Sequence, residues 1–168
     1  MLIKATQGGG GKGMRIVEKI EDFDQAIISA RREGKAFFDD QTVILEKYIP
    51  VARHIEVQIV GDSHKNYIHL FERDCSLQRK YQKLIEEAPA TNIDPSIKEK
   101  LYSAALQIAQ KLSYSGLATV EFLVTNNKAK DFYFLEVNPR IQVEHTVTEA
   151  ITGIDLVGLQ IDIADGDK

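Results

Sequence analysis

The chain has little of several features that mark whole classes of protein. Its 168 residues include a single cysteine, Cys75, which excludes an intramolecular disulfide, is too few for a cysteine-rich zinc cluster and fits a reducing compartment. No run approaches the roughly 20 apolar residues of a membrane span. The formal net charge is −4, which gives no electrostatic footprint of a nucleic-acid-binding protein. We therefore expect partners other than membranes and nucleic acids.

The remaining composition is typical of a globular protein that can build a core. Apolar residues make up 43% and charged residues 27% of the chain, and the length suits one domain, or one lobe with a small subdomain. Met1 leads almost directly into a glycine run, so we expect no signal peptide. A strand-like segment starts near residue 1 and a helix-like segment, 154–164, stands near the end. We therefore expect a piece of a longer enzyme, with a complete small protein as the alternative.

A glycine run near the N-terminus is the first candidate site. Five of the six residues from 8 to 13 are glycine, and glycine tolerates positive φ and exposes its N–H to a ligand. The run leads into a strand at Met14 rather than a helix, so it is not a Walker A motif. We predict a flap over phosphates, with a floppy hairpin turn as the alternative. Lys4 would reach the phosphates as a point charge, although a lone strand lysine is usually solvated.

Residues 1–46 have the pattern of a small lid. Strands are expected over 2–5, 14–17 and 42–46, and a helix after Asp22, which with Gln25 forms a capping-box pattern. Residues at helical spacing predict the packed stripe of that helix: Phe23, Ala26, Ile27, Ala30, Gly34 and Phe37.

Residues from 47 onward are richer in strands. Strands are expected over 53–59, 67–71, 117–124 and 132–138, and a helix from Asp94-Pro95. The expected core positions are Ile55, Val57 and Ile59, then Ile97, Leu101, Ala104, Ala105, Ile108 and Leu112, then Ala118, Val120, Phe122 and Val124. His54, Glu56 and Gln58 would share the opposite face of their strand. The fold class is α+β, a mostly antiparallel sheet packed with helices.

Two strands predict a metal site. Regular alternation would place Phe132, Phe134, Glu136 and Asn138 on one face of their strand, where a glutamate is costly to bury unless it is paired or binds a metal. Glu121 lies opposite the apolar face of the preceding strand. If the two strands form a hairpin, Glu121 and Glu136 converge, and two carboxylates with an amide oxygen suit Mg²⁺. Two unrelated surface glutamates are the alternative.

Three further stretches carry weaker signals. Residues 72–83 and 139–145 are dense in hydrogen-bond donors, and each could bind oxyanions or be a solvated turn. The strand expected over 42–46 leads into Glu46-Lys47-Tyr48, which could form a hinge that holds adenine, although most such segments are simply strand ends.

These residues together resemble the biotin carboxylase family of the ATP-grasp superfamily, and the match runs through essentially the whole chain. The shared motifs are Lys-Ala-x-x-Gly-Gly-Gly-Gly-x-Gly-Met from Lys4, Glu-Lys-Tyr from Glu46, Arg-His-Ile-Glu-Val-Gln from Arg53, Glu-Arg-Asp-Cys-Ser-Leu-Gln-Arg from Glu72, Gln-Lys-x-x-Glu-Glu-Ala-Pro from Gln82 and Glu-Val-Asn-Pro-Arg-Ile-Gln-Val-Glu-His from Glu136. The resemblance implies an ATP-grasp fold, with a lid (B) subdomain over 1–46 and part of the C-terminal lobe, holding the metal and bicarbonate sites, over 47–168.

The resemblance also implies a role for individual positions. Those implied to bind ATP are Lys4, Gly8, Gly9, Gly10, Gly11, Gly13, Glu46, Lys47, Ile49, His54, Gln78 and Tyr81. Those implied to bind metal are Glu121, Glu136 and Asn138. Bicarbonate would be held by Arg140, Gln142 and Val143. Lys83, Arg140 and Glu144 would be catalytic, with Lys83 near the γ-phosphate and Glu144 taking the proton of bicarbonate.

The implied activity is that of a ligase that forms a C–N bond. ATP with Mg²⁺ (or Mn²⁺) would activate bicarbonate to carboxyphosphate, and biotin would be carboxylated as a substrate carried on a biotin carboxyl carrier domain. A carboxyltransferase component would use the product, the parent enzyme would be a homodimer, and its location would be cytoplasmic or, in a eukaryote, the mitochondrial matrix. The final acceptor stays open.

The chain departs from the family pattern in two respects. Tyr81 stands where the family commonly has histidine, which could alter nucleotide affinity. The family enzyme also has segments before Lys4 and after Lys168 that supply another phosphate-binding lysine and an arginine for the biotin enolate. We therefore expect this chain to be inactive alone. The alternatives are another ATP-grasp ligase, or a nucleotide-binding module without turnover.

Overall fold

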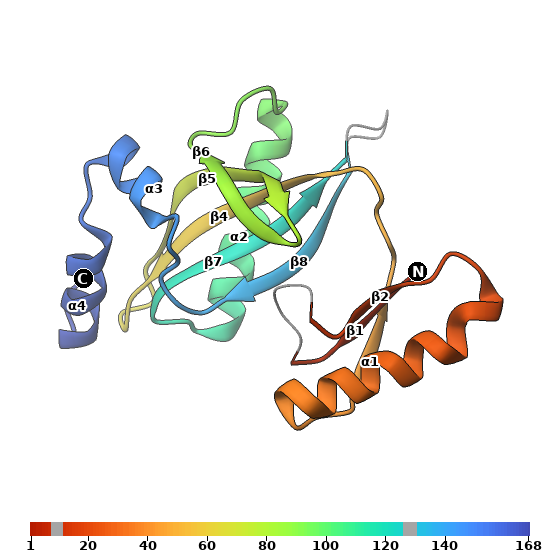
Figure 1. The fold of residues 1–168 in the computed structure, drawn as a ribbon. Coiled ribbons are helices and arrows are strands. Elements are labelled where there is room, and N and C mark those ends of the chain that lie inside the picture. The colour runs from red at the N-terminus through yellow and green to blue at the C-terminus, as the bar shows by residue number, and fades with distance from the viewer. Residues whose placement is uncertain (8–11, 126–130) are drawn as a thin grey trace. The chain divides into compact units, whose positions relative to one another are not determined.

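The computed structural model describes residues 1–7, 12–125 and 131–168, and these divide into two compact units. The first comprises residues 1–50 with 79–82, and the second residues 51–78 with 83–168. Figure 1 shows the elements of each unit along the chain. The predicted flap glycines Gly8–Gly11 and the predicted turn at 126–128 lie outside the described residues. Within the described residues, no helix is both long and apolar enough to span a membrane.

The first unit is a small sheet with one helix packed on it. The strands β1 (Leu2–Ala5), β2 (Met14–Ile16) and β3 (Val43–Glu46) are antiparallel in the order β2-β1-β3. A 3₁₀ turn, η1 (Ile20–Asp22), leads into α1 (Phe23–Phe38). The core of this unit consists of Ile3, Val17 and Ala30. The predicted strands and helix are therefore confirmed to within a residue or two.

The two ends of α1 differ from the prediction. Asp22 has helical dihedral angles (φ −85°, ψ −9°) and its side chain makes no capping hydrogen bond, because the 3₁₀ turn already precedes the helix. The predicted capping box is therefore wrong. At the other end Phe37 is 54% exposed and lies under the ammonium group of Lys12, 4.5 Å from the ring centroid, so it does not belong to the packed stripe.

The second unit is built on a five-stranded sheet in the order β6-β5-β4-β7-β8. Its strands are β4 (Arg53–Gly61), β5 (Tyr67–Arg79), β6 (Gln82–Glu87), β7 (Gly116–Val124) and β8 (Phe132–Asn138). The pairs β4–β5, β4–β7 and β7–β8 are antiparallel, as predicted. β5 is longer than predicted, and residues 72–79, interpreted from sequence as a possible solvated turn, are part of the strand.

One face of this sheet is apolar and is covered by α2 (Pro95–Leu112). Asp94 caps the helix as predicted, its carboxylate accepting a hydrogen bond of 2.9 Å from the Ser96 N–H. Leu112 was predicted to be buried but is 64% exposed, because it is the last residue of the helix. The buried core includes Ile55, Val57, Ile59, Leu101, Tyr102, Ala105, Ala109, Ala118, Val120, Phe122 and Val124.

A register shift in the β7–β8 pair sets which side chains face α2. Phe122 lies opposite Phe134, and Glu121 lies opposite Glu136, with Leu135 as the extra residue between them. Such a bulge reverses the alternation along its strand. Phe134 therefore packs edge-on against the core residue Phe122, whereas Glu136 faces the other side. The prediction that Glu136 shares a face with Phe132 and Phe134 was wrong.

The other face of the sheet is polar, although much of it is buried. The fully buried side chains of Glu56 and Gln58 lie on this face. The helix α3 (His145–Thr152) approaches it through a hydrogen bond between Thr148 and Arg73. The last helix, α4 (Leu156–Asp165), contributes Leu156 and Ile163 to a small separate apolar cluster with Val60, Leu70 and Leu117.

Strand β5 carries two consecutive buried charges that face opposite sides of the sheet. On the α2 side, Glu72 accepts hydrogen bonds from the Ala90 N–H (3.0 Å) and the Tyr102 hydroxyl, and it forms an ion pair of 2.6 Å with Lys98. On the polar side, Arg73 is fully buried. Successive strand residues point to opposite faces, so these two adjacent residues of β5 place one charge on each side of the sheet.

Candidate functional site

The polar face of the sheet gathers three carboxylates around one lysine. Lys83, on β6, places its Nζ 2.5 Å from a carboxylate oxygen of Glu56, 2.9 Å from one of Glu121 and 2.6 Å from one of Glu144. These carboxylates come from β4, from β7 and from the residue that precedes α3. The lysine side chain is 17% exposed and the three carboxylates at most 7%. The fold therefore shields a cluster of four formal charges from most of the solvent.

Glu121 is the most highly connected of the three carboxylates. Its Oε1 accepts hydrogen bonds from Asn138 Nδ2 (2.9 Å) and Gln142 Nε2 (3.3 Å). Its Oε2 lies 2.7 Å from His54 Nε2, and the other nitrogen of that ring lies 2.7 Å from Gln78 Nε2. Five residues that the sequence assigned to the site, His54, Gln78, Glu121, Asn138 and Gln142, are thus brought together.

The charges of this cluster set its protonation. Burial alone would lower the pKa of Lys83, but Glu56, Glu121 and Glu144 outweigh it and raise the pKa well above the usual value. Burial alone would raise the pKa of Glu121, but His54 and Lys83 lower it to about 2. Burial would likewise raise the pKa of Glu144, and the hydrogen bond from Lys83 with the charge of Arg73 lowers it. At neutral pH Glu121 and Glu144 are therefore ionised and Lys83 is charged.

The low pKa of Glu121 predicts a loss of stability in acid. A carboxylate whose pKa falls from about 4.5 to about 2 on folding contributes stability above pH 4.5, and this contribution disappears as the pH falls towards 2. For a side chain this buried, the contribution is on the order of 3 kcal/mol. We expect the free energy of unfolding, measured with urea, to fall over this range in the wild type and to fall less steeply in Glu121→Gln. An equal fall of the unfolding free energy with pH in the two proteins would contradict the low pKa of Glu121.

The predicted metal ligands Glu121, Glu136 and Asn138 are oxygen donors on β7 and β8. Glu136 lies directly opposite Glu121 in the β-ladder, which puts both side chains on one face, and the Asn138 amide contacts Glu121. Ionised carboxylates and an amide oxygen are suitable Mg²⁺ ligands. In another group, Glu56, Cys75 and Glu144, one ligand atom of each residue lies within 4.8 Å of the others. This group suits Mg²⁺ poorly because burial and Glu56 raise the pKa of the Cys75 thiol. The predicted donors therefore have the chemistry that Mg²⁺ prefers, and their role as metal ligands stays a prediction.

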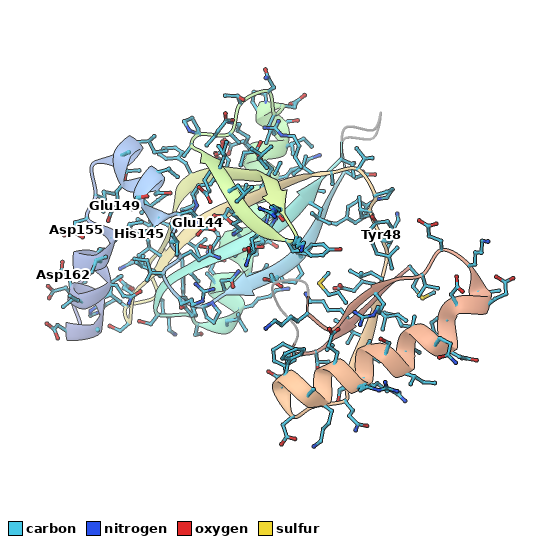
Figure 2. All side chains as sticks on the ribbon, in the orientation of Figure 1. Tyr48, Glu144, His145, Glu149, Asp155 and Asp162 are labelled. Carbon is cyan, nitrogen blue, oxygen red and sulfur yellow. The ribbon has the colours of Figure 1, made fainter. Side chains whose placement is uncertain are left out.

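The segment between β8 and α3 carries the predicted bicarbonate residues. Arg140 is exposed and its guanidinium donates a hydrogen bond of 3.1 Å to the carbonyl of Ile141. Gln142 is buried, and its amide oxygen has no hydrogen-bond partner among the described residues. Val143 is 89% exposed. Figure 2 labels Glu144 and His145 where this segment enters α3. The segment thus presents an exposed guanidinium close in sequence to a buried amide and a carboxylate.

The remaining predicted ATP-binding residues belong to the first unit. Lys4 is buried on β1. Gly13 has φ +71°, and a Cβ there would come within 2.8 Å of the Ala5 Cβ, so the position requires glycine. Its N–H donates a hydrogen bond of 2.9 Å to Glu33. Glu46 ends β3, with Lys47 and Ile49 following it. The roles of these residues remain predictions.

Tyr81 lies in the tight turn between β5 and β6. Both Lys80 (φ +51°) and Tyr81 (φ +64°) are in the left-handed region, as a two-residue hairpin turn of type I′ requires. The Tyr81 side chain is 55% exposed. The backbone at this position is therefore set by the hairpin, and the effect of tyrosine on nucleotide affinity stays a prediction.

Sequence reasoning did not assign a site role to two central residues, Glu56 and Arg73. Glu56 contacts Lys83 through one oxygen and Arg73 through the other. The available signal was the alternation along β4, which placed Glu56 on the same face as His54. Arg73 belonged to the donor-dense stretch 72–83, but its place on a buried strand face was not predicted.

Comparison with known proteins identifies relatives over the whole chain. The family model described as carbamoyl-phosphate synthase L chain, ATP binding domain, matches residues 1–168. The alpha subunit of mitochondrial methylcrotonoyl-CoA carboxylase from Rattus norvegicus is 51% identical over 168 residues, which is 100% of this chain and 23% of that protein. The chain thus spans about a quarter of the length of this curated relative.

Two solved structures share the fold. Biotin carboxylase from Campylobacter jejuni, described as a β-γ-ATP complex, matches with a TM-score of 0.95 and 48% identity over 99% of this chain and 37% of that one. The biotin carboxylase domain dimer of 2-oxoglutarate carboxylase from Hydrogenobacter thermophilus matches with a TM-score of 0.93 and 44% identity, over 99% of this chain and 36% of that one. The latter structure is a complex with MgADP, ADP and bicarbonate.

Proposed function

The chain belongs to the carbamoyl-phosphate synthase L chain, ATP-binding domain family, as the biotin carboxylase ATP-binding domain of a biotin-dependent carboxylase, and we propose that it activates bicarbonate with ATP for the carboxylation of biotin. Its fold is the α+β ATP-grasp domain, with a small three-stranded sheet and a larger antiparallel sheet. The domain would act as part of a ligase that is longer than this chain.

The observation that carries the proposal is the cluster around Lys83. A charged lysine shared by Glu56, Glu121 and Glu144 provides a cation for a phosphoryl group and carboxylates for a metal and a proton. We propose that the Lys83 ammonium group exchanges some of its contacts with these carboxylates for contacts with the γ-phosphate of ATP. Its preorganised positive charge would then stabilise the transfer of the phosphoryl group.

We propose that Glu144 is the general base. Its carboxylate is ionised at neutral pH because Lys83 and Arg73 lower its pKa. It would take the proton of bicarbonate, and the bicarbonate oxygen would then attack the γ-phosphorus of ATP, giving carboxyphosphate and ADP. Arg140, Gln142 and the Val143 backbone would orient bicarbonate. The unpartnered amide oxygen of Gln142 supports a polar ligand at this place.

Glu121, Glu136 and Asn138 would hold the metal ion. Bound Mg²⁺ or Mn²⁺ would neutralise charge on the triphosphate of ATP. The relative in complex with MgADP and bicarbonate supports this choice of cofactor. On the ATP side, Lys4, Gly8–Gly11 and Gly13 would surround the phosphates, Glu46, Lys47 and Ile49 would contact adenine, and His54, Gln78 and Tyr81 would border the ribose and phosphates.

Carboxyphosphate would then release CO₂ and phosphate. That phosphate would remove the proton from the ureido nitrogen of biotin. The deprotonated nitrogen would then add to CO₂ and form the new C–N bond. Biotin would arrive on a biotin carboxyl carrier domain, and a carboxyltransferase component would transfer the carboxyl group to an acceptor. The homodimeric state proposed for the parent enzyme is supported by the domain dimer of the Hydrogenobacter relative. A cytoplasmic or mitochondrial location fits this partnership.

The proposal is tested by measuring phosphate release from ATP by the intact polypeptide that carries this chain. We expect release that requires bicarbonate and a divalent metal, and that is coupled to carboxylation of biotin. Release driven by a different carboxylic acid, with no response to bicarbonate, would indicate another ATP-grasp ligase. ATP binding without any release would indicate a nucleotide-binding module.

The isolated 168-residue chain is expected to bind MgATP weakly or not at all, and not to carboxylate free biotin. The reason is that the family implies a further phosphate-binding lysine and an arginine for the biotin enolate beyond this stretch. Isothermal titration with the non-hydrolysable β,γ-imido analogue of ATP, together with a carboxylation assay, checks this expectation. Robust ATP-dependent carboxylation of free biotin by the chain alone would refute it.

A further inference from the structure

We infer that Arg73 is a positioning residue that fixes Lys83 and the start of α3 relative to each other. The inference rests on the proposed function, because it assigns Arg73 a role in the same reaction. Arg73 would not touch ATP or bicarbonate. It would act through Glu56 on the lysine, and through Thr148 on the helix that follows Glu144.

The first line of support is that all three nitrogens of the Arg73 guanidinium group donate hydrogen bonds. Its Nε donates to Glu56 Oε1 (2.5 Å), its Nη1 to Gln58 Oε1 (2.8 Å) and Thr148 Oγ1 (2.8 Å), and its Nη2 to Thr119 Oγ1 (3.1 Å). All of these partners are buried. Four hydrogen bonds from one planar group fix its orientation, and a lysine ammonium, with three donors on a flexible stem, cannot reproduce that pattern.

The second line of support is the division of Glu56 between two cations. Its Oε1 accepts from Arg73 and its Oε2 from Lys83. A carboxylate held by one cation offers a fixed oxygen to the other. Arg73 thereby sets where Lys83 sits between Glu121 and Glu144. If the guanidinium were lost, Glu56 would be free to turn towards the lysine and draw it away from those two carboxylates.

The third line of support is the bond from Arg73 to α3. Thr148 is only 1% exposed and lies four residues after Glu144, one helical turn along. The Arg73–Thr148 bond therefore anchors the first turn of α3 to β5, and with it the carboxylate that would take the proton. One side chain thus controls the relative placement of the phosphate-binding cation and the base.

The competing view is that Arg73 only neutralises a buried carboxylate and so contributes to folding alone. The chain contains a matched case of that situation. Glu72, the neighbouring residue on β5, is buried on the α2 side of the sheet and forms an ion pair with Lys98 (2.6 Å), away from the Lys83 cluster. Lys98→Met is therefore a control that removes one cation from a buried carboxylate without touching the proposed site.

The experiment compares Arg73→Lys, Thr148→Val and Lys98→Met with the wild type in the intact polypeptide. We expect Arg73→Lys to lower kcat for bicarbonate-dependent ATP cleavage about 10- to 100-fold, in line with the effect of displacing reacting groups by about 1 Å. KM for ATP should change less than about threefold. Thr148→Val should lower kcat less than Arg73→Lys does.

A second readout does not depend on activity. Backbone amides of residues 145–152 should exchange with deuterium faster in Arg73→Lys and Thr148→Val, because the anchor of α3 is weakened. Lys98→Met should lower the unfolding temperature but leave kcat and the exchange of these amides close to the wild type.

The results separate this inference from the proposed function. Absence of bicarbonate-dependent ATP cleavage in the wild type would refute the proposed function itself. With an active wild type, the inference is overturned if Arg73→Lys keeps kcat within about twofold. It is equally overturned if Lys98→Met lowers kcat as much as Arg73→Lys does, since the effect would then follow stability alone.

Discussion

Replacing Glu144 by glutamine is expected to abolish bicarbonate-dependent ATP cleavage in the intact polypeptide while leaving MgATP binding close to that of the wild type. The amide cannot accept the bicarbonate proton, and general base catalysis typically contributes about 10²- to 10⁴-fold. The substitution keeps the shape of the side chain, so the loss would appear in kcat. Phosphate release measures turnover, and titration with a non-hydrolysable ATP analogue measures binding.

Glu149→Gln provides the matched control for this variant. Glu149 lies on α3 and accepts a hydrogen bond of 2.8 Å from the Leu156 N–H, which the oxygen of a glutamine side chain can also accept. We expect its turnover to stay within about twofold of the wild type. Undiminished turnover in Glu144→Gln would remove Glu144 as the base, and an equal loss in both variants would point to damage to α3.

Replacing Lys83 by methionine is expected to destabilise the fold and to abolish turnover. The change leaves Glu121 and Glu144 without their shared cation in a largely buried site, and removing one partner of a buried ion pair costs about 3–5 kcal/mol. Urea unfolding at pH 7 measures the effect. Because the carboxylates would regain ordinary or raised pKa values, the loss of stability relative to the wild type should be smaller at pH 5 than at pH 7.

Lys100→Met is the control for this second prediction. Lys100 is exposed on α2, and surface charges of this kind contribute little to stability. We expect its free energy of unfolding to stay within about 0.5 kcal/mol of the wild type. A Lys83→Met variant as stable as Lys100→Met would mean that the three carboxylates do not depend on the lysine.

Local sequence patterns predicted much of the fold because the strands and helices obey simple periodicities. Alternation located the core positions Ile55, Val57 and Ile59, which are at most 1% exposed, and the Asp94-Pro95 pair located the start of α2. The failures arose where a neighbouring element changed the local rule. A 3₁₀ turn replaced the capping box at Asp22. The second half of β5 was hidden because most of its residues are polar, and two of them, Glu72 and Arg73, are buried by tertiary contacts.

The bulge in β8 shows how a prediction can succeed for the wrong reason. Glu121 and Glu136 do lie opposite each other, as the predicted hairpin required. Strict alternation would have put Glu136 beside Phe134, facing α2, and the extra residue at Leu135 turns it to the polar face. A bulge is set by pairing with β7 and not by the β8 sequence alone, so the pattern could not reveal it.

The candidate site was only partly predictable from the sequence. Glu121 and Asn138 were predicted from the pattern of their strands, and His54, Lys83, Gln142 and Glu144 from the family resemblance; these six residues form connected contacts here. Arg73 lies in one of the motifs that carry this resemblance but was given no role, because its contacts are with four partners on β4, β7 and α3 that are far apart in sequence. The part played by Gly8–Gly11 stays a prediction.

The adjacent charges Glu72 and Arg73 have a consequence for how β5 finds its place during folding. A slip of one residue along β4 would turn the arginine towards the hydrocarbon of α2 and remove both residues from their ionic partners at once. Such a misaligned intermediate would bury two charges without their ionic partners, which is energetically costly. The two adjacent charges therefore favour the observed register of the β4–β5 hairpin over registers that are shifted by one residue.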